Sequence, residues 1–457
     1  MTESFPSARS LEGHDFRIER DPLGPYPVPK HALYGIHTAR AVANFPISGT
    51  IINTFPELIA ALARIKKVAC HVNAELGALP KHLVGPITRA CDEVASGRWK
   101  DQFVVDIFQG GAGTSTNMNV NEVIANRALL LMGKQLGDYK TVDPIGHVNR
   151  CQSTNDCYAS AMRLAIYELN GRLLCALGRL ADALDEKSYA FAMIEKLGRT
   201  QLQDAVPMTL GAEIGAFATT LQKDFDEFSR LPQIFLEINL GGTAIGSGIG
   251  ASSGYRDVIV RAVAVEFGLP VTAAKDLYEA SWDMGDFVLY SGLLKRLAVK
   301  LSKIVSDLRL LASGPRGGLG ELILPARQAG SSLMPGKVNP VIPEAINQIA
   351  FRIFGLDTSI TFAAEAGQLQ LNAFEPLIYS SIHEAVTLLS ASMDVLRTSC
   401  VEGLEANAEE CRVNLDSSVA RATEASETLG YERAALIARH ALQSGKSWTE
   451  ALADINS

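Results

Sequence analysis

Apolar side chains recur at helical spacing along most of the chain. Between residues 287 and 313, charged side chains such as Lys295 and Lys303 occupy one face. The opposite face is an apolar stripe at steps of three or four residues: Tyr290, Leu294, Leu297, Leu301, Ile304, Leu308 and Leu311. Comparable patterns run through residues 162–185 and 343–366. Three long amphipathic helices are therefore predicted.

Each of these stretches is longer than the usual helix of about a dozen residues. An apolar stripe of that length must be covered along the whole helix, which a bundle achieves within one subunit or between several. A further helix is predicted to begin at Pro56, because proline suits the first turn. The segment before Phe55 differs, since its prolines at positions 22, 25, 27 and 29 predict short strands joined by turns. The expected fold is mainly α with a mixed N-terminal part.

Composition and charge restrict the classes of molecule that this protein is expected to bind. The 457 residues carry a net charge of −8 without a long basic block, which argues against nucleic acid. The seven cysteines are an odd number without a Cys-x-x-Cys pair, so neither a disulfide framework nor a zinc site is expected. The sequence shows neither a signal peptide nor an apolar stretch of about eighteen residues. We predict a cytoplasmic protein without a membrane partner.

Three islands rich in glycine, serine and threonine interrupt the predicted helices, at residues 109–119, 239–250 and 328–340. The third contains the string Gly330-Ser331-Ser332, followed by a lysine and an asparagine. These residues offer a nucleophile or base, a cation and an amide on a segment that can move. Residues of the same types also dominate ordinary surface turns. The residues alone therefore leave a surface turn and a catalytic loop both open.

The string from Gly330 to Pro340, Gly-Ser-Ser-Leu-Met-Pro-Gly-Lys-Val-Asn-Pro, resembles the signature loop of the aspartase/fumarase superfamily. The resemblance extends from Arg17 to about Asn407, and it thins afterwards. Three other segments are similar to active-site segments of that family: Gly113-Thr-Ser-Thr-Asn-Met-Asn-Val-Asn-Glu122, His147-Val-Asn-Arg-Cys-Gln-Ser-Thr-Asn-Asp156 and Gly198-Arg-Thr-Gln-Leu-Gln-Asp-Ala-Val-Pro207.

The resemblance implies a mainly α-helical fold of three domains. These are a mixed N-terminal domain (residues 1–142), a central bundle of long helices (143–397) and a small helical C-terminal domain (398–457). It also implies a homotetramer in which each active site is built by three subunits. In the family the C-terminal domain lies near the mouth of the active site. The divergence after residue 400 is therefore where altered substrate scope or regulation is expected.

Three positions distinguish branches of this superfamily. Fumarases usually carry Ser-Ser-Asn-Asp, Arg-Thr-His and Thr-Gln-Cys-Glu where this chain has Ser153-Thr154-Asn155-Asp156, Arg199-Thr200-Gln201 and Val341-Ile-Pro-Glu344. The resemblance therefore implies an ammonia-lyase that converts aspartate reversibly into fumarate. A fumarase, or a related carbon–nitrogen lyase for a substituted aspartate, is the alternative. A catalytically silent relative with a structural role is a third hypothesis, which the intact loop residues disfavour.

Removal of ammonia requires a proton to leave the carbon beside a carboxylate. That carboxylate must accept a second negative charge, giving an enediolate (aci-carboxylate), which preorganised donors can stabilise. The resemblance implies Ser331 as the base and no metal or organic cofactor in this step. The other implied roles are donors to the developing charge (Thr114, Ser153, Thr154 and Thr200), a grip on the second carboxylate (Lys337 and Asn339), a contact to the amino group (Asn155) and further substrate contacts (Ser115, Asn117 and Gln201).

Glu344 follows the loop and has two interpretations. By resemblance it orients the loop or Gln201. Alternatively, it is a plain carboxylate at a helix N-terminus, where the helix dipole favours negative charge. The sequence leaves both open.

Overall fold

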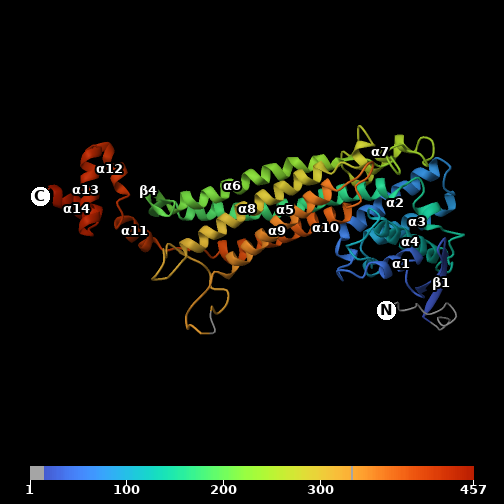
Figure 1. The fold of residues 1–457 in the computed structure, drawn as a ribbon, viewed down its shortest axis with the longest axis horizontal. Helices are drawn as coiled ribbons and strands as arrows, with labels where there is room; N and C mark the ends of the chain where they lie inside the picture. Colours follow the sequence, from blue (N-terminus) through green and yellow to red (C-terminus); the bar gives the residue numbers. More distant parts are fainter. Residues whose placement is uncertain (1–14, 331–332, 457) are drawn as a thin grey trace. The chain divides into compact units, whose positions relative to one another are not determined.

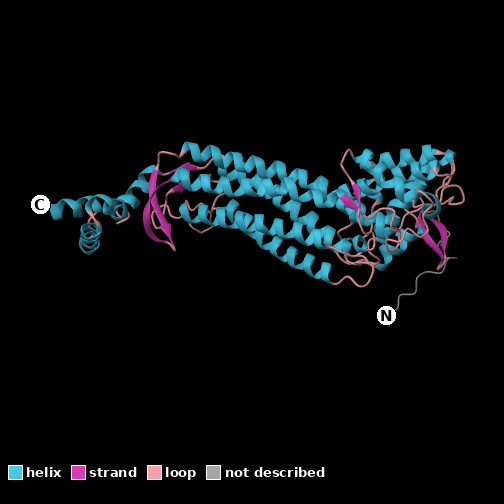
Figure 2. Cartoon of the chain, turned by 90° about the horizontal axis from the view of Figure 1, so that it is seen from above, coloured by secondary structure: helices cyan, strands magenta, loops and turns pink. Residues whose placement is uncertain are grey.

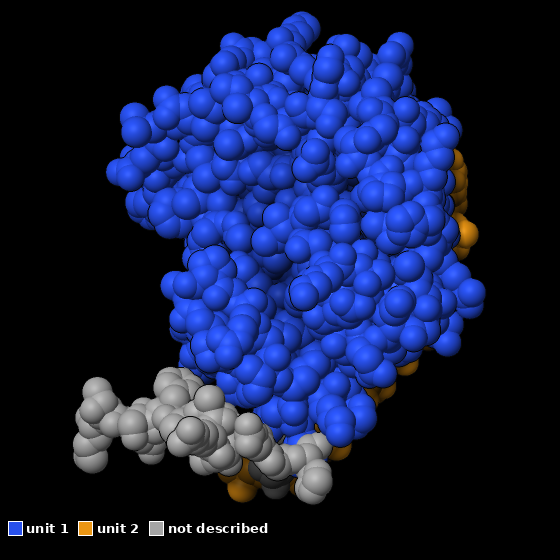
Figure 3. All heavy atoms as spheres, turned by 90° about the vertical axis from the view of Figure 1, so that its right-hand side faces the viewer, with its two compact units in different colours: residues 1–171, 230–292, 355–386 blue, residues 172–229, 293–354, 387–457 orange. Residues whose placement is uncertain are grey.

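The computed structural model describes residues 15–330 and 333–456 (Figure 1). Most of these residues are helical, which confirms the mainly α prediction. Contacts along the chain divide it into two compact units, coloured separately in Figure 3. Unit 1 comprises residues 1–171, 230–292 and 355–386, and unit 2 comprises residues 172–229, 293–354 and 387–457. The three-domain division at residues 142 and 397 stays a prediction.

Unit 1 contains the mixed N-terminal segment. Its first two strands pair antiparallel, and the second strand carries three of the four prolines, which a strand with a free edge tolerates. The helix predicted at Pro56 begins there. The elements of this unit outside the long helices are β1 (Phe16–Asp21), β2 (Gly24–Pro29), α1 (Ile36–Asn44), α2 (Pro56–Glu75), α3 (Lys81–Ala95), α4 (Thr114–Leu131), β5 (Glu237–Ile238), α7 (Tyr255–Phe267) and β6 (Thr272–Ala273).

Among the described residues, five long helices follow the mixed segment, and three of them confirm the apolar patterns in the sequence. The predicted stripe of the helix at residues 287–313 is buried, since Leu297, Leu301 and Leu308 are each at most 1% exposed. Within unit 2 these helices run alongside one another (Figures 1 and 2). No helix in the described part of the chain is long and apolar enough to cross a membrane. The five helices are α5 (Thr154–Ala190), α6 (Leu210–Arg230), α8 (Gly285–Leu311), α9 (Val341–Glu365) and α10 (Glu375–Leu396).

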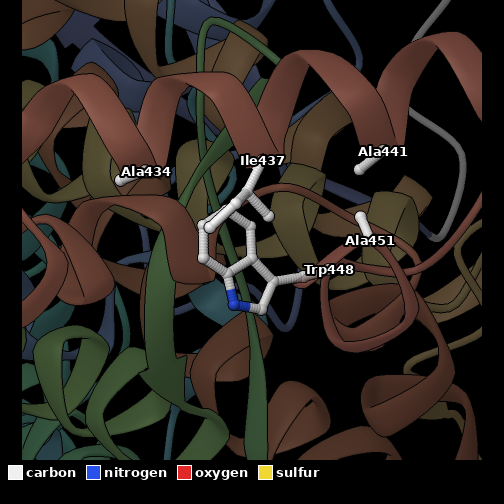
Figure 4. Close-up of a cluster of buried hydrophobic side chains, with 5 residues drawn as sticks. All are labelled: Ala434, Ile437, Ala441, Trp448 and Ala451. Carbon is white, nitrogen blue, oxygen red and sulfur yellow. The ribbon is translucent and has the colours of Figure 1, made fainter. Parts of the chain in front are cut away.

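Unit 2 also contains a hairpin, a short antiparallel strand pair and the C-terminal helices. The last two helices share a small apolar core around Ile437 and Trp448, which is shown in Figure 4. The elements are β3 (Glu195–Thr200), β4 (Gln203–Thr209), β7 (Leu322–Ile323), β8 (Glu405–Ala406), α11 (Ala408–Asp416), α12 (Arg421–Leu429), α13 (Tyr431–Ser444) and α14 (Trp448–Asn456). Short 3₁₀ and π segments are Ile52–Thr54, Lys100–Gln102, Pro144–Val148, Leu231–Leu236, Glu279–Ser281 and Arg397–Val401.

The first glycine-rich island is helical in its second half. The prediction that residues 109–119 interrupt the helices is wrong from Thr114 onward, where α4 begins. Polar side chains on α4 are buried and bond to other segments instead of to water. Asn119, for example, accepts from Val104 N at 3.1 Å and donates to Gln102 O at 2.9 Å. These tertiary hydrogen bonds stabilise a helix that its composition does not suggest.

Candidate active site

The candidate site residues of unit 1 lie at the start of two helices, α4 and α5. Gly113 precedes α4 with a φ of +83° and packs against the ring of Tyr158 on α5. A Cβ atom at Gly113 would lie 2.7 Å from that ring, so only glycine fits. This close contact holds the first turn of α4, with Thr114 and Ser115, against the first turns of α5.

The start of α5 is fixed by a reciprocal cap. Ser153 N donates to Asp156 Oδ1 at 2.9 Å, and Asn155 N donates to Ser153 Oγ at 3.2 Å. The other carboxylate oxygen of Asp156 accepts from Gly241 N at 3.1 Å and from Thr243 N at 2.9 Å. Burial raises the pKa of Asp156 to about 7, although these backbone donors favour the carboxylate. Asp156 therefore ties the second glycine-rich island to the start of α5.

Asn155 strengthens the same connection. Its Nδ2 donates to Ala244 O at 2.7 Å, while Asn239 Nδ2 donates to the Asn155 carbonyl at 3.0 Å. The sequence singles out residues 239–250 but assigns them no role. The structure shows that this island packs against a predicted substrate-binding segment and determines how Asn155 is presented.

Asn117 connects α4 to α5 through a buried polar network. Its Nδ2 donates to Thr154 Oγ1 at 3.0 Å and to Asn149 Oδ1 at 3.2 Å. Its Oδ1 accepts from Lys66 Nζ of α2 at 2.7 Å. Lys66 is fully buried, and burial lowers the pKa of its ammonium group. The network thus places a cation directly behind two predicted substrate-binding residues.

Lys66 was not predicted from the sequence, although the sequence contains a signal for it. Lys66 follows Leu62 by four residues and precedes Ala69 by three, and both of these are buried on α2. A lysine on the apolar face of a helix needs a polar partner inside the protein. That position marks Lys66 as a buried donor, but only the structure identifies its acceptors.

The hydroxyl of Thr114 is turned toward its own loop. Thr114 Oγ1 donates to Gly111 O at 2.7 Å, and Ser115 is buried one residue further along α4. Thr116 closes the loop, because both its backbone N and its Oγ1 donate to Gln109 Oε1 at 2.9 Å. The loop before α4 is therefore held by its own hydrogen bonds.

Thr200 and Gln201 lie in unit 2 at the exposed tip of the β3–β4 hairpin. The two turn residues, Gln201 and Leu202, have positive φ values of 53° and 62°. Positive φ at both positions suits a tight hairpin but strains residues other than glycine. Buried Glu321 braces β3 of this hairpin, pairing with Arg199 at 2.7 Å and with Lys196 at 2.8 Å. The fold therefore presents Thr200 and Gln201 on a braced, strained turn.

The two ends of the signature loop lie close together. Asn339 Nδ2 donates to Gly330 O at 2.6 Å. A Cβ atom at Gly330 would lie only 1.8 Å from the Lys337 carbonyl oxygen, so the two ends of the loop touch. Lys337 is exposed. Ser331, the predicted base, lies outside the described residues.

Glu344 lies in the first turn of α9, the helix-terminal position that one of its two interpretations requires. Its Oε1 is 3.8 Å from Arg309 Nη2. The role of Glu344 in orienting the loop or Gln201 stays a prediction.

The structure thus brings together Asn117, Ser153, Thr154 and Asn155 in unit 1, beside the start of α4. It places Thr200 with Gln201, and Lys337 with Asn339, in unit 2. Helix N-termini surrounded by hydroxyl and amide groups are suited to bind carboxylates.

A cavity of about 410 Å³ in unit 1 is lined by other residues than these, with Arg163, Glu279 and Asp286 in its wall. Among residues 15–330 and 333–456, no cluster of three histidine, cysteine or acidic side chains could hold a metal ion.

Known proteins match this chain over nearly its whole length. A protein family described as lyase matches residues 24–355. Aspartate ammonia-lyase of Pseudomonas aeruginosa is 52% identical over 435 residues, covering 95% of this chain and 92% of that protein. Aspartate ammonia-lyase of Escherichia coli K12 is 46% identical over 438 residues, covering 96% and 92%.

Two solved structures share the fold. The fumarate lyase:delta crystallin from Brucella melitensis bound to cobalt has a TM-score of 0.95 and 50% identity, covering 97% of this chain and 96% of that one. The class II fumarase from Schistosoma mansoni has a TM-score of 0.91 and 32% identity, covering 96% and 95%. These matches confirm the fold class that the sequence motifs predict.

Proposed function

Because the chain belongs to the lyase family, within the aspartase/fumarase superfamily, we propose that it is an aspartate ammonia-lyase, which converts L-aspartate reversibly into fumarate and ammonia. The observation that carries this proposal is the close agreement with relatives named aspartate ammonia-lyase over almost the entire chain. Thr154 and Gln201, which differ from the usual fumarase residues, support the amine substrate.

In the proposed reaction Ser331 takes a proton from the carbon beside the side-chain carboxylate. The electrons of that bond move into the carboxylate and form the enediolate. They then form the carbon–carbon double bond while the carbon–nitrogen bond breaks and ammonia leaves. Ser153, Thr154 and Thr200 would donate to the developing charge, and Thr114 would do so once its hydroxyl turns away from Gly111 O. Removing one such donor typically costs about 10²- to 10³-fold in rate.

The other substrate contacts follow the chemistry of each side chain. Lys337 and Asn339 would bind the second carboxylate, and Asn155 would hold the amino group. Ser115, Asn117 and Gln201 complete the proposed set of substrate-binding residues, with Glu344 orienting the loop. The N-termini of α4 and α5 support this assignment, because each offers backbone donors and a positive dipole end to an anion.

We propose a homotetramer in which each site takes residues from three subunits. α5 contains 37 residues, a length of roughly 55 Å at 1.5 Å per residue. A helix of this length needs partners along its sides, which other subunits can supply. Large apolar side chains on the long helices also need cover, since Val299, Phe351 and Phe362 are 52%, 59% and 69% exposed.

A cytoplasmic location also belongs to this proposal. All seven cysteines are free thiols, as expected for a reducing compartment.

The test is the absorbance of fumarate after aspartate, and separately malate, is added to the purified protein without added cofactor. A rise with aspartate and none with malate is expected. A rise with malate alone would move the assignment to a fumarase. An unchanged absorbance with both substrates would contradict both activities and would point to a substituted aspartate as the substrate.

A further inference from the structure

Lys66 is a buried lysine whose hydrogen-bond partners in the described part of the chain are all neutral amides. Its Nζ contacts Asn117 Oδ1 at 2.7 Å, Asn149 Oδ1 at 3.2 Å and Gln152 Oε1 at 3.4 Å. All three acceptors are amide oxygens. A buried ammonium group without a carboxylate partner is costly, since ion pairing normally offsets the loss of hydration. The chain therefore keeps a lysine in a place where an apolar side chain would pack at lower cost.

The charge determines which way the Asn117 amide faces. A lysine ammonium has three donors and no acceptor, so the Asn117 atom beside it must be the oxygen. Cys157 Sγ donates to the same oxygen at 3.4 Å. A flipped amide would place its NH₂ group against both donors, so Lys66 would lose its shortest hydrogen bond and Cys157 would lose this acceptor, which costs free energy. The Asn117 NH₂ group therefore faces Thr154.

This orientation controls the hydroxyl of Thr154. A threonine hydroxyl has one proton to donate and two acceptor positions. Because Asn117 Nδ2 donates to Thr154 Oγ1 at 3.0 Å, the Thr154 proton is not used by Asn117. With the opposite amide orientation, Thr154 would donate its proton to Asn117 and lose it for binding an anion.

We propose that Lys66 is a positioning residue. It fixes the direction of the hydrogen bonds from Lys66 through Asn117 to Thr154, so that the Thr154 hydroxyl donates its proton to the substrate carboxylate. This inference rests on the proposed function, because it needs Thr154 to contact the substrate. It adds a residue and a directed chain of donors behind the site.

The most informative variant is Asn117→Asp. The aspartate keeps an acceptor for Lys66 and makes that contact a charged hydrogen bond. This offsets the loss of the bond to Asn149 Oδ1, so the thermal unfolding midpoint should change little. Its second oxygen, however, can only accept and must draw the proton of Thr154. We expect kcat/KM for aspartate to fall about 100-fold, mainly through kcat, as for the loss of one donor to the developing charge.

Thr154→Val removes the hydroxyl itself and completes a double-mutant cycle. If Asn117→Asp acts only through Thr154, the double variant loses no more than about twofold in kcat/KM beyond Thr154→Val alone. A role of Asn117 in general packing, or a direct contact of its own with the substrate, would instead multiply the two losses. Multiplied losses, or an Asn117→Asp variant with wild-type kcat/KM, would overturn the positioning role.

Lys66→Met tests the charge, with Lys67→Met as the matched control. Lys67 is the next residue on α2 and forms ion pairs with Asp92 at 3.0 Å and Glu266 at 3.3 Å. Lys66→Met should lower kcat by at least about tenfold in the wild-type background and have almost no effect in the Thr154→Val background. Lys67→Met should leave kcat unchanged in both. Equal effects of the two lysine variants would contradict the proposal.

The proposed function and the positioning role of Lys66 are contradicted by different results. A wild-type protein that forms no fumarate from aspartate would contradict the proposed function, and the positioning role would fall with it. An active wild type in which the Asn117 and Thr154 losses multiply would leave the function standing and overturn the positioning role alone.

Discussion

Ser153 and Asp156 cap the start of α5 together: Ser153 N donates to Asp156 Oδ1 at 2.9 Å, while Ser153 Oγ accepts from Asn155 N at 3.2 Å. The second oxygen of Asp156 accepts two further backbone donors from the island at residues 239–250. One buried carboxylate thus orders the predicted substrate-binding segment and the loop beside it.

Asp156→Ala should therefore destabilise the protein strongly. The substitution leaves the N–H groups of half-buried Ser153 and of buried Gly241 and Thr243 without an acceptor, and each buried unsatisfied group costs about 1–3 kcal/mol. We expect the free energy of unfolding, measured with denaturant at fixed protein concentration, to fall by at least about 3 kcal/mol. Glu409→Ala, which removes an exposed carboxylate on α11, is the control and should change little. A similarly small loss for Asp156→Ala would contradict this role.

Glu375 should make stability depend on pH. Both of its side-chain oxygens are buried and lack a hydrogen-bond partner in the described part of the chain. Burial raises the pKa of Glu375 from 4.5 to about 8, opposed by the charge of Arg163. Between these values the unfolded chain loses the proton and the folded chain keeps it, so stability falls as pH rises. Below pH 4.5 the group has no effect.

Glu375→Gln removes this titration. The variant should gain stability relative to the wild type by roughly 1.4 kcal/mol per pH unit inside that window. Denaturant unfolding at several pH values measures the difference. A difference that is independent of pH would mean that Glu375 is ionised in the folded protein.

Gly330→Ala should abolish activity without unfolding the protein. The new Cβ would lie 1.8 Å from the Lys337 carbonyl oxygen, so the base of the signature loop would have to open. We expect kcat to fall by at least about 100-fold, because displacing a catalytic group by about 1 Å already has such an effect. Gly85→Ala, whose Cβ meets open space in α3, is the control. Wild-type kcat in Gly330→Ala would show that activity does not require the close contact between the two ends of the loop.

Leu202→Gly should stabilise the β3–β4 hairpin. Leu202 has a φ of 62° and an exposed fraction of 69%, so its side chain is strained and contributes little packing. Removing the Cβ relieves a left-handed conformation that costs about 1–2 kcal/mol. Leu202→Ala removes the same apolar surface but keeps the Cβ, so it should bring no gain in thermal stability. Equal effects of the two substitutions would show that the backbone at Leu202 is not strained.

The long helices could be predicted from the sequence because their signal is local. The stripe from Leu294 to Leu308 repeats at helical spacing, and a helix buried on one face needs no other information. The start of α4 could not be predicted in this way. Its serine, threonine and asparagine side chains favour turns when taken alone, and the helix depends on partners such as Gln102, far from Asn119 in the sequence.

The site residues could be predicted from the resemblance to the family, and only partly from the chemistry of their side chains. Thr154 and Asn117 are expected in the site because of the motifs that contain them. Lys66 belongs to no such motif, and its acceptors come from residues 117–152, which only folding brings to it. The island at residues 239–250 was visible as a break in the helices, but its role depends on tertiary contacts to Asp156.

Serine-base chemistry is tested by the initial rate of fumarate formation from aspartate, measured side by side for the wild-type protein and for Ser331→Ala. Ser96→Ala, an exposed serine at the end of α3, is the matched control. The wild type and the control should turn over aspartate at equal rates, while Ser331→Ala forms no measurable fumarate but keeps the oligomeric state. A Ser331→Ala variant that retains most of the wild-type rate would contradict a serine-base ammonia-lyase.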